Sequence, residues 1–295
     1  MNYAITGATG HIGGKIAATL LSKGCQVRVI GRTAERLKGL VGKGATAWAG
    51  NLADVAFVRR AFAGVDAVFA MIPPDNQAVD FRACQTRVGG ALAEAIKVAG
   101  VKYVVNLSSV GAHLPVGTGP IAGLHEQEER LNQIPGLNIL HLRPTFFMEN
   151  LMIGIGLIKT QGINGSALKG DLRFPVIATR DIASAASAEL ATPAFKGVSV
   201  KELLGPRDHT MEEMTKILGQ AIGKPDLKYV QFSYEDTRQA MLGMGLSPDV
   251  ARLYIEMYTA FNEGRITRGL MRTPANTTPT TFEEFAREFA AAYKA

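Results

Sequence analysis

The first 32 residues constrain the fold of this chain more than any other segment. A short apolar run at residues 3–6 has the pattern of a strand, and glycines follow at once as Gly7, Gly10 and Gly13. A helix is predicted next, over residues 15–21, and a second strand over residues 26–30. This order of strand, glycine loop, helix and strand predicts the βαβ unit that opens a dinucleotide-binding fold.

The three glycines suit a pyrophosphate for physical reasons. They allow a tight turn, close approach of the backbone to the phosphates, and close packing of the helix on the strand. The helix start adds free N–H groups and a partial positive charge. The alternative is a glycine-rich turn without a ligand, because a chain with 32 glycines produces chance matches. The strand before the loop and the helix after it favour the dinucleotide site.

The end of the second strand indicates which dinucleotide is bound. Sites for NAD usually place a carboxylate there, whereas an arginine pairs with the 2′-phosphate of NADP. This chain has Arg32 followed by Thr33, with Arg36 one helical turn on and no acidic residue before Glu35. The sequence therefore predicts NADP(H) as cofactor. The alternative is that Arg32 stacks on the adenine or lies in solvent.

Composition limits the classes of protein to consider. The chain of 295 residues suffices for one large domain with a smaller lobe, and 47% hydrophobic with 20% charged residues is ordinary for a globular protein. The net charge of +6 suits an anionic ligand, but the basic residues are scattered and form no nucleic-acid-binding motif. We therefore expect no nucleic-acid partner.

The cysteines and the hydropathy of the sequence indicate the cellular compartment in which we expect the protein. Cys25 and Cys84 lie far apart without metal-ligand spacing, which predicts reduced core thiols in a cytoplasmic protein. No apolar run reaches membrane-spanning length, and the first strand begins too early to leave room for a signal peptide. We expect neither a membrane partner nor a metal site, and the sequence gives no oligomeric state.

Strands and helices alternate through the first half of the chain. Strands are predicted at residues 46–49, 66–71, 102–107 and 137–142, and helices at 34–41, 55–62, 79–99 and 126–133. This alternation predicts the α/β class with a Rossmann-type, doubly wound parallel sheet. Ligands of such sheets bind beyond the carboxyl ends of the strands. We therefore expect one cleft where six loops converge, at Gly7, Gly31, Asn51, Ile72, Ser108 and Arg143.

The pattern changes after residue 145. A strand is predicted at 174–177, a helix at 179–190 with Thr179 as its cap, a strand at 198–204 that returns to the main sheet, and a helix at 210–222. The sequence thus predicts a Rossmann domain of residues 1–145 with a returning segment at about 179–205. Residues 146–178 and 206–295 would form a smaller, mainly helical C-terminal lobe for a substrate or partner.

Six motifs together are more specific than the glycines alone. They are Gly7-x-x-Gly10-x-x-Gly13, Gly31-Arg32, Gly50-Asn51-Leu52, Ser108-Ser109, Arg143-Pro144-x-x-Phe147-x-x-Asn150 and Thr179-Arg180-Asp181-Ile182-Ala183. In this set the chain resembles the NmrA-like group of atypical short-chain dehydrogenases/reductases. It looks most like the bacterial NAD(P)H:quinone oxidoreductase and azoreductase-like members. The resemblance runs from residue 2 to about 205 and is looser beyond.

The resemblance implies a set of residues around NADP(H). They are Gly7, Thr9, Gly10, His11, Ile12 and Gly13 at the pyrophosphate, Arg32 and Thr33 at the 2′-phosphate, Asn51 and Leu52 beside the adenine, Met71, Ile72 and Pro73 on the adenosine side, Ser108 and Ser109 near the nicotinamide ribose, and Pro144 and Phe147 at the nicotinamide ring. Some have a plainer alternative. Leu52, Met71 and Ile72 have the character of core residues, and Asn51 that of a turn residue.

The chain departs from the wider superfamily in its catalytic residues. Ser109 is in place for the usual serine, but residues 110–135 contain no tyrosine and no lysine, so the usual proton donor is missing. Reduction of an aldehyde or ketone needs a proton at the alkoxide. Quinones need less help, because the hydride leaves a stabilised phenolate. His125 and His113 are substitutes near the same strand end, with a solvated histidine as the alternative for each.

Two functions remain open from the sequence. The first is an NADPH-dependent reductase that passes hydride directly to a quinone or similar flat electrophile. The second is a redox sensor, which binds NADP(H) and a regulatory protein partner without significant turnover. A pocket that binds an aromatic ring would favour the reductase. The residues that could form such a pocket could equally belong to the core of the lobe: Phe146, Phe147, Met148, Met152 and Phe174.

Overall fold

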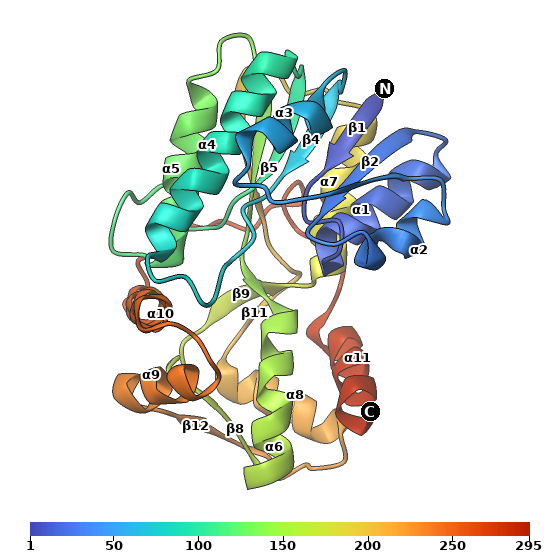
Figure 1. Ribbon diagram of the computed structural model, residues 1–295. Coiled ribbons are helices and arrows are strands. Elements are labelled where there is room, and N and C mark those ends of the chain that lie inside the picture. Colours follow the sequence, from blue (N-terminus) through green and yellow to red (C-terminus); the bar gives the residue numbers. More distant parts are fainter.

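Seven parallel strands form the central sheet of the computed structural model, which describes all 295 residues (Figure 1). The strand order is β10-β6-β5-β4-β1-β2-β3, so the direction of winding reverses between β1 and β4. This is the doubly wound Rossmann-type arrangement, and the predicted fold class is confirmed. The strands are β1 (Asn2–Ile5), β2 (Gln26–Gly31), β3 (Thr46–Ala49), β4 (Ala67–Ala70), β5 (Tyr103–Leu107), β6 (Asn138–Pro144) and β10 (Val198–Leu203).

Helices cover both faces of this sheet. One face packs on α1 (His11–Ser22) and α7 (Thr179–Ala191), and the other packs on α3 (Val55–Phe62), α4 (Phe81–Ala99) and α5 (Pro120–Asn132). Each face has its own apolar core, because strands of a parallel sheet are buried on both sides. The short η1 (Glu35–Leu37) and α2 (Lys38–Val41) connect β2 to β3.

The remaining elements form a second body below the carboxyl edge of the sheet in Figure 1. Its core is rich in phenylalanine: Phe174 lies 5.8 Å from Phe261 and 5.6 Å from Phe146, measured between ring centroids. We propose that this body is the lobe predicted from the sequence, with residues 146–178 and 206–295. Its elements are β7 (Phe146–Phe147), η2 (Met148–Gly154), α6 (Ile155–Gln161), β8 (Ile163–Ser166), β9 (Phe174–Ile177), β11 (Asp208–His209), α8 (Met211–Ala221), β12 (Lys228–Gln231), α9 (Tyr234–Gly243), α10 (Pro248–Asn262) and α11 (Phe282–Lys294).

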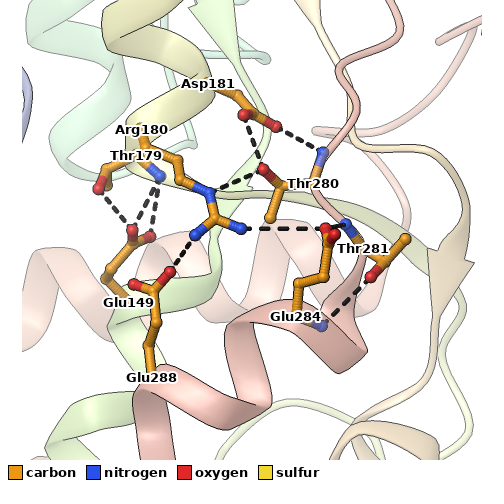
Figure 2. A network of polar contacts seen from close by, with 8 residues as sticks. All are labelled: Glu149, Thr179, Arg180, Asp181, Thr280, Thr281, Glu284 and Glu288. Atoms are coloured by element: carbon orange, nitrogen blue, oxygen red, sulfur yellow. Dashed lines mark hydrogen bonds and ion pairs between the residues drawn. The ribbon is translucent and has the colours of Figure 1, made fainter.

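A polar network joins the sheet helix α7 to this body (Figure 2). Glu149 of η2 accepts hydrogen bonds from the backbone N–H of Thr179, at 2.9 Å, and from its hydroxyl, at 2.5 Å. Arg180 donates to the Thr280 hydroxyl at 2.9 Å and pairs with Glu288 of α11. The motif at residues 179–183 therefore fastens α7 to η2 and α11.

Several elements differ from the sequence-based prediction. Helix α5 begins at Pro120 rather than at residue 126, because the proline occupies the first helical turn after Gly119. Thr179 is not the cap of α7: Ala178 is, and the Thr179 side chain turns to Glu149 instead. The predicted helix at 34–41 is broken into η1 and α2.

Two further features concern the whole chain. Both cysteines are free and only partly buried, so the prediction of core thiols was wrong about their burial. None of the helices combines the length and the apolar composition that crossing a membrane requires.

Candidate functional site

The glycine loop between β1 and α1 is built around close backbone contacts. Gly7 has a φ of +64°, in the left-handed region, and its carbonyl oxygen accepts the N–H of Gly10 at 3.0 Å. A Cβ at Gly13 would lie only 2.5 Å from that same carbonyl oxygen, so the helix packs on the turn too closely for any side chain. The first turn of α1 holds no acidic residue and Gly10 supplies no side-chain cap. The loop therefore fits a pyrophosphate.

Arg32 stands beside this loop at the end of β2. It is exposed and forms no ion pair, whereas Glu35 is 2.7 Å from the ammonium of Lys38. A Cβ at the preceding residue, Gly31, would lie 3.0 Å from the Thr9 side chain, which shows how near this strand end is to the glycine loop. Thr33 is exposed next to Arg32. These residues fit the phosphate-bearing side of NADP(H).

The residues predicted at the adenine and adenosine side have structural partners of their own. Asn51 is exposed, and its side-chain oxygen accepts the N–H of Ala53 at 2.9 Å, as in a turn. Leu52 belongs to the core of the sheet. Met71 touches the glycine loop: a Cβ on Gly7 would lie 2.8 Å from its sulfur. Roles for these residues at the cofactor, and for Ile72 and Pro73 next to them, stay predictions.

The structure separates the two serines after β5. The Ser108 hydroxyl donates to Glu128 at 2.5 Å, and Glu128 is buried and accepts a second hydrogen bond from Arg143 Nε at 2.9 Å. Ser108 is therefore held by an internal ion pair. Ser109 is half-buried, and its hydroxyl forms no hydrogen bond inside the protein. Both serines line a large cavity, so they differ in whether the hydroxyl is already engaged.

That cavity has a volume of about 750 Å³, within the range of small-molecule sites. It starts at the carboxyl edge of the sheet, at Met71, Ser109 and Phe147, and continues into the second body toward α9 and α10. Of its 36 lining residues 22 are hydrophobic, and none carries a charge. The cavity can therefore surround a flat, neutral molecule but offers no partner for a charged group.

The aromatic candidates divide between this cavity and the core. Phe146 and Phe147 line the cavity. Met148 and Phe174 are fully buried in the core of the second body, and Met152 packs against it. Pro144, predicted beside the nicotinamide, is buried and does not line the cavity.

The histidine candidates lie outside the cavity. His125 is in the middle of α5 rather than near its start, and its Nδ1 lies 2.9 Å from the carbonyl oxygen of Ala112. His113 is exposed in a loop. Neither lines the cavity, so the geometry does not support a histidine proton donor there.

Sequence reasoning missed two tyrosines. Tyr254 and Tyr258 lie one turn apart on α10, and both line the cavity. Burial raises the pKa of Tyr254, and burial together with the neighbouring tyrosines raises the pKa of Tyr258 to about 12. Their spacing on one helix face, one turn before Phe261, was the available signal.

The cavity also holds polar atoms without a protein partner. The hydroxyls of Thr145 and Thr237 and the side-chain oxygen of Gln85 are buried at its wall and accept or donate no hydrogen bond. Sites that bind and orient a small molecule usually have mostly apolar walls with a small number of polar groups, as this cavity does.

The chain is similar to known proteins in both sequence and fold. The sequence matches the NmrA-like family over residues 2–286. It is 31% identical over 296 aligned positions to the NAD(P)H azoreductase of Xenophilus azovorans, covering 99% of both chains. Two solved structures share the fold: an NADPH-dependent quinone oxidoreductase of Escherichia coli (24% identity, TM-score 0.76, covering 97% of this chain and 98% of that one), and the triphenylmethane reductase of Citrobacter sp. complexed with NADP(H) (20% identity, TM-score 0.80, 98% and 100%). The chain belongs to the NmrA-like family.

Proposed function

We propose that this protein reduces quinones, or similarly flat and uncharged electrophiles, with NADPH as the hydride source. The chain is an NAD(P)H-dependent oxidoreductase of the NmrA-like family, related along its whole length to an NAD(P)H azoreductase. The substrate class rests on one observation, which is the large, mostly apolar cavity without a single charged lining residue.

The glycine loop and the end of β2 would hold the cofactor. The free N–H groups at the start of α1 would bind the pyrophosphate, and the unpaired Arg32 would bind the 2′-phosphate. When bound, NADPH supplies a hydride from the nicotinamide. Phe147 and Ser109, at the sheet end of the cavity, would position the substrate and keep water from it.

The cavity wall selects against charged substrates. A phosphorylated or sugar-nucleotide substrate would lose its water shell there without gaining a cation, which costs several kcal/mol or more. A conjugated neutral ring instead gains about 25 cal/mol for each Å² of apolar surface buried. The solved relatives by fold include an NADPH-dependent quinone oxidoreductase, which is consistent with this class.

The experiment pairs cofactor binding with turnover. Purified protein is titrated with NADPH and NADH by nicotinamide fluorescence, then mixed with a panel of quinones while NADPH absorbance is followed. Arg32→Ala should weaken NADPH binding roughly tenfold to a hundredfold, the value of a charge-assisted hydrogen bond, and leave NADH unchanged. Arg268→Ala is the matched control, because Arg268 is also exposed and without an ion pair and is not among the predicted cofactor-binding residues.

The outcome also separates the two functions that the sequence left open. Quinone-dependent oxidation of NADPH supports the reductase. Tight NADPH binding with no oxidation by any acceptor would overturn the proposal and favour a redox sensor. Equal loss of affinity in the Arg32 and Arg268 variants would contradict the role of Arg32 at the 2′-phosphate.

A further inference from the structure

The cavity needs a hydrogen-bond donor at the substrate. Hydride transfer to a quinone leaves two electrons and one hydrogen on it, so negative charge develops on a carbonyl oxygen before a proton from water completes the hydroquinone. A buried oxyanion is costly unless it is hydrogen-bonded. Residues 110–135 contain neither the tyrosine nor the lysine that the superfamily uses, and no cation lines the cavity.

Helix α10 presents two tyrosine side chains to the cavity. Tyr254 and Tyr258 both line the cavity, and neither hydroxyl forms a hydrogen bond inside the protein. Neither hydroxyl oxygen is fully buried, so both remain accessible to a molecule in the cavity. Both rings are half-buried, which limits their movement.

Hydrogen bonds at its start, in its middle and shortly after its end hold α10 in place. Ser247 caps its start by accepting the N–H of Val250 at 3.1 Å. Glu256, between the two tyrosines, accepts the N–H of Gly119 at 3.2 Å, directly before α5. Shortly after the helix, Arg265 donates to the carbonyl oxygen of Gly117 at 2.9 Å. The tyrosines are therefore presented by a rigid element, as an oxyanion site requires.

We propose that Tyr254 and Tyr258 donate hydrogen bonds to the substrate oxygen on which negative charge develops. This inference rests on the proposed function. Because burial raises the pKa of Tyr258 to about 12, its hydroxyl stays protonated near neutral pH. An ordinary phenol has a pKa of about 10, so the reduced product takes its proton from water and not from Tyr258. The tyrosines thus stabilise charge and are not consumed.

The test compares Tyr254→Phe, Tyr258→Phe and the double variant with the wild type. Each change removes a hydroxyl and keeps the ring, so KM and NADPH affinity should stay close to wild type. Loss of an oxyanion donor typically costs a hundredfold or more in kcat. We expect kcat to fall at least tenfold in the double variant, and most for the quinones that are hardest to reduce. A double variant within threefold of wild type would overturn the inference.

A tyrosine elsewhere in the same lobe provides the control. The Tyr229 hydroxyl donates to the carbonyl oxygen of Leu168 at 2.6 Å and does not line the cavity. Tyr229→Phe should therefore lower the free energy of unfolding and leave kcat unchanged. If all three tyrosine variants lower kcat equally, the effect is structural and the inference fails.

A binding measurement distinguishes this inference from the proposed function. Holoprotein saturated with NADP⁺ is titrated with 4-nitrophenol, whose phenolate has its own absorption band. Wild type should hold a larger fraction of the bound ligand as phenolate than the double variant at the same pH. If wild type shows no turnover but this difference is found, the donors stand and the quinone reductase does not. If wild type oxidises NADPH with quinones but holds no more phenolate than the double variant, and kcat is unchanged in the variants, the quinone reductase stands and the tyrosine donors do not.

Discussion

Both carboxylate oxygens of Asp181 accept hydrogen bonds from Thr280, one from its backbone N–H at 3.0 Å and one from its hydroxyl at 2.7 Å. Asp181 is in the first turn of α7, against the sheet, and Thr280 directly precedes the cap of α11. Both residues are buried. The pair therefore ties the C-terminal helix to the Rossmann-type sheet, within the network of Figure 2.

Asp181→Ala should destabilise the whole chain. The change leaves two buried donors of Thr280 without an acceptor, which predicts a loss of about 2–3 kcal/mol in the free energy of unfolding, measured by urea denaturation. Glu288→Gln is the control, because Glu288 pairs with Arg180 at the surface and should change stability by less than about 1 kcal/mol. Equal effects of the two changes would mean that Asp181 has no special role in joining α7 to α11.

Two glycines of the same loop should respond differently to alanine. At Gly13 a Cβ would meet the Gly7 carbonyl oxygen at 2.5 Å, so Gly13→Ala must displace α1 and lower stability. At Gly10 the nearest atom would be 3.4 Å away, so Gly10→Ala should fold with nearly wild-type stability but weaken NADPH binding by crowding the pyrophosphate. Urea unfolding and a fluorescence titration of both variants check this. A Gly10→Ala variant with wild-type affinity would argue against phosphate binding at that turn.

The two serines after β5 should separate stability from turnover. Ser108→Ala removes a donor to buried Glu128, which predicts a loss of about 1–3 kcal/mol in the free energy of unfolding with little effect on kcat. Ser109→Ala removes a hydroxyl that has no partner in the protein, from a residue that lines the cavity, and should lower kcat/KM about threefold to tenfold at unchanged stability. Thermal unfolding and steady-state kinetics distinguish the two. The reverse pattern would place Ser108 and not Ser109 at the substrate.

His141 should make the protein less stable as the pH falls. It is fully buried in β6, where its Nδ1 accepts from Asn106 at 3.1 Å and its Nε2 donates to Asn132 at 2.9 Å. Burial lowers its pKa from 6.5 to about 4. The unfolded chain therefore binds a proton that the folded one does not, and the stability present above pH 6.5 is lost as the pH falls toward 4, by up to about 3 kcal/mol.

Urea unfolding at several pH values between 4 and 7 measures this effect. His141→Gln should make the pH dependence shallower in that window. Some dependence should remain, because burial lowers the pKa of His209 as well. An unchanged slope in the variant would show that other groups carry the acid sensitivity.

Local sequence signals were sufficient for several elements of both bodies. The bounds of β3, α3 and β9 were predicted to the residue, because each is a short apolar or amphipathic run between clear breaks. The start of α5 was missed, since Pro120 follows a glycine-rich stretch that has no helical pattern of its own. The glycine loop and Arg32 could be proposed as cofactor-binding residues from the sequence alone, because the pattern of a pyrophosphate site is contained in neighbouring residues.

The sequence by itself determined the α/β class, the NADP(H)-type loop and the absence of the usual tyrosine and lysine after β5, because all of these are local patterns. Only the tertiary structure decided which serine keeps a free hydroxyl, since Ser108 donates to Glu128, which also pairs with Arg143, both from distant elements. It also decided that the cavity is uncharged and that Tyr254 and Tyr258 line it. Those facts depend on packing α10 against the start of α5, and long-range packing leaves no local signature in the chain.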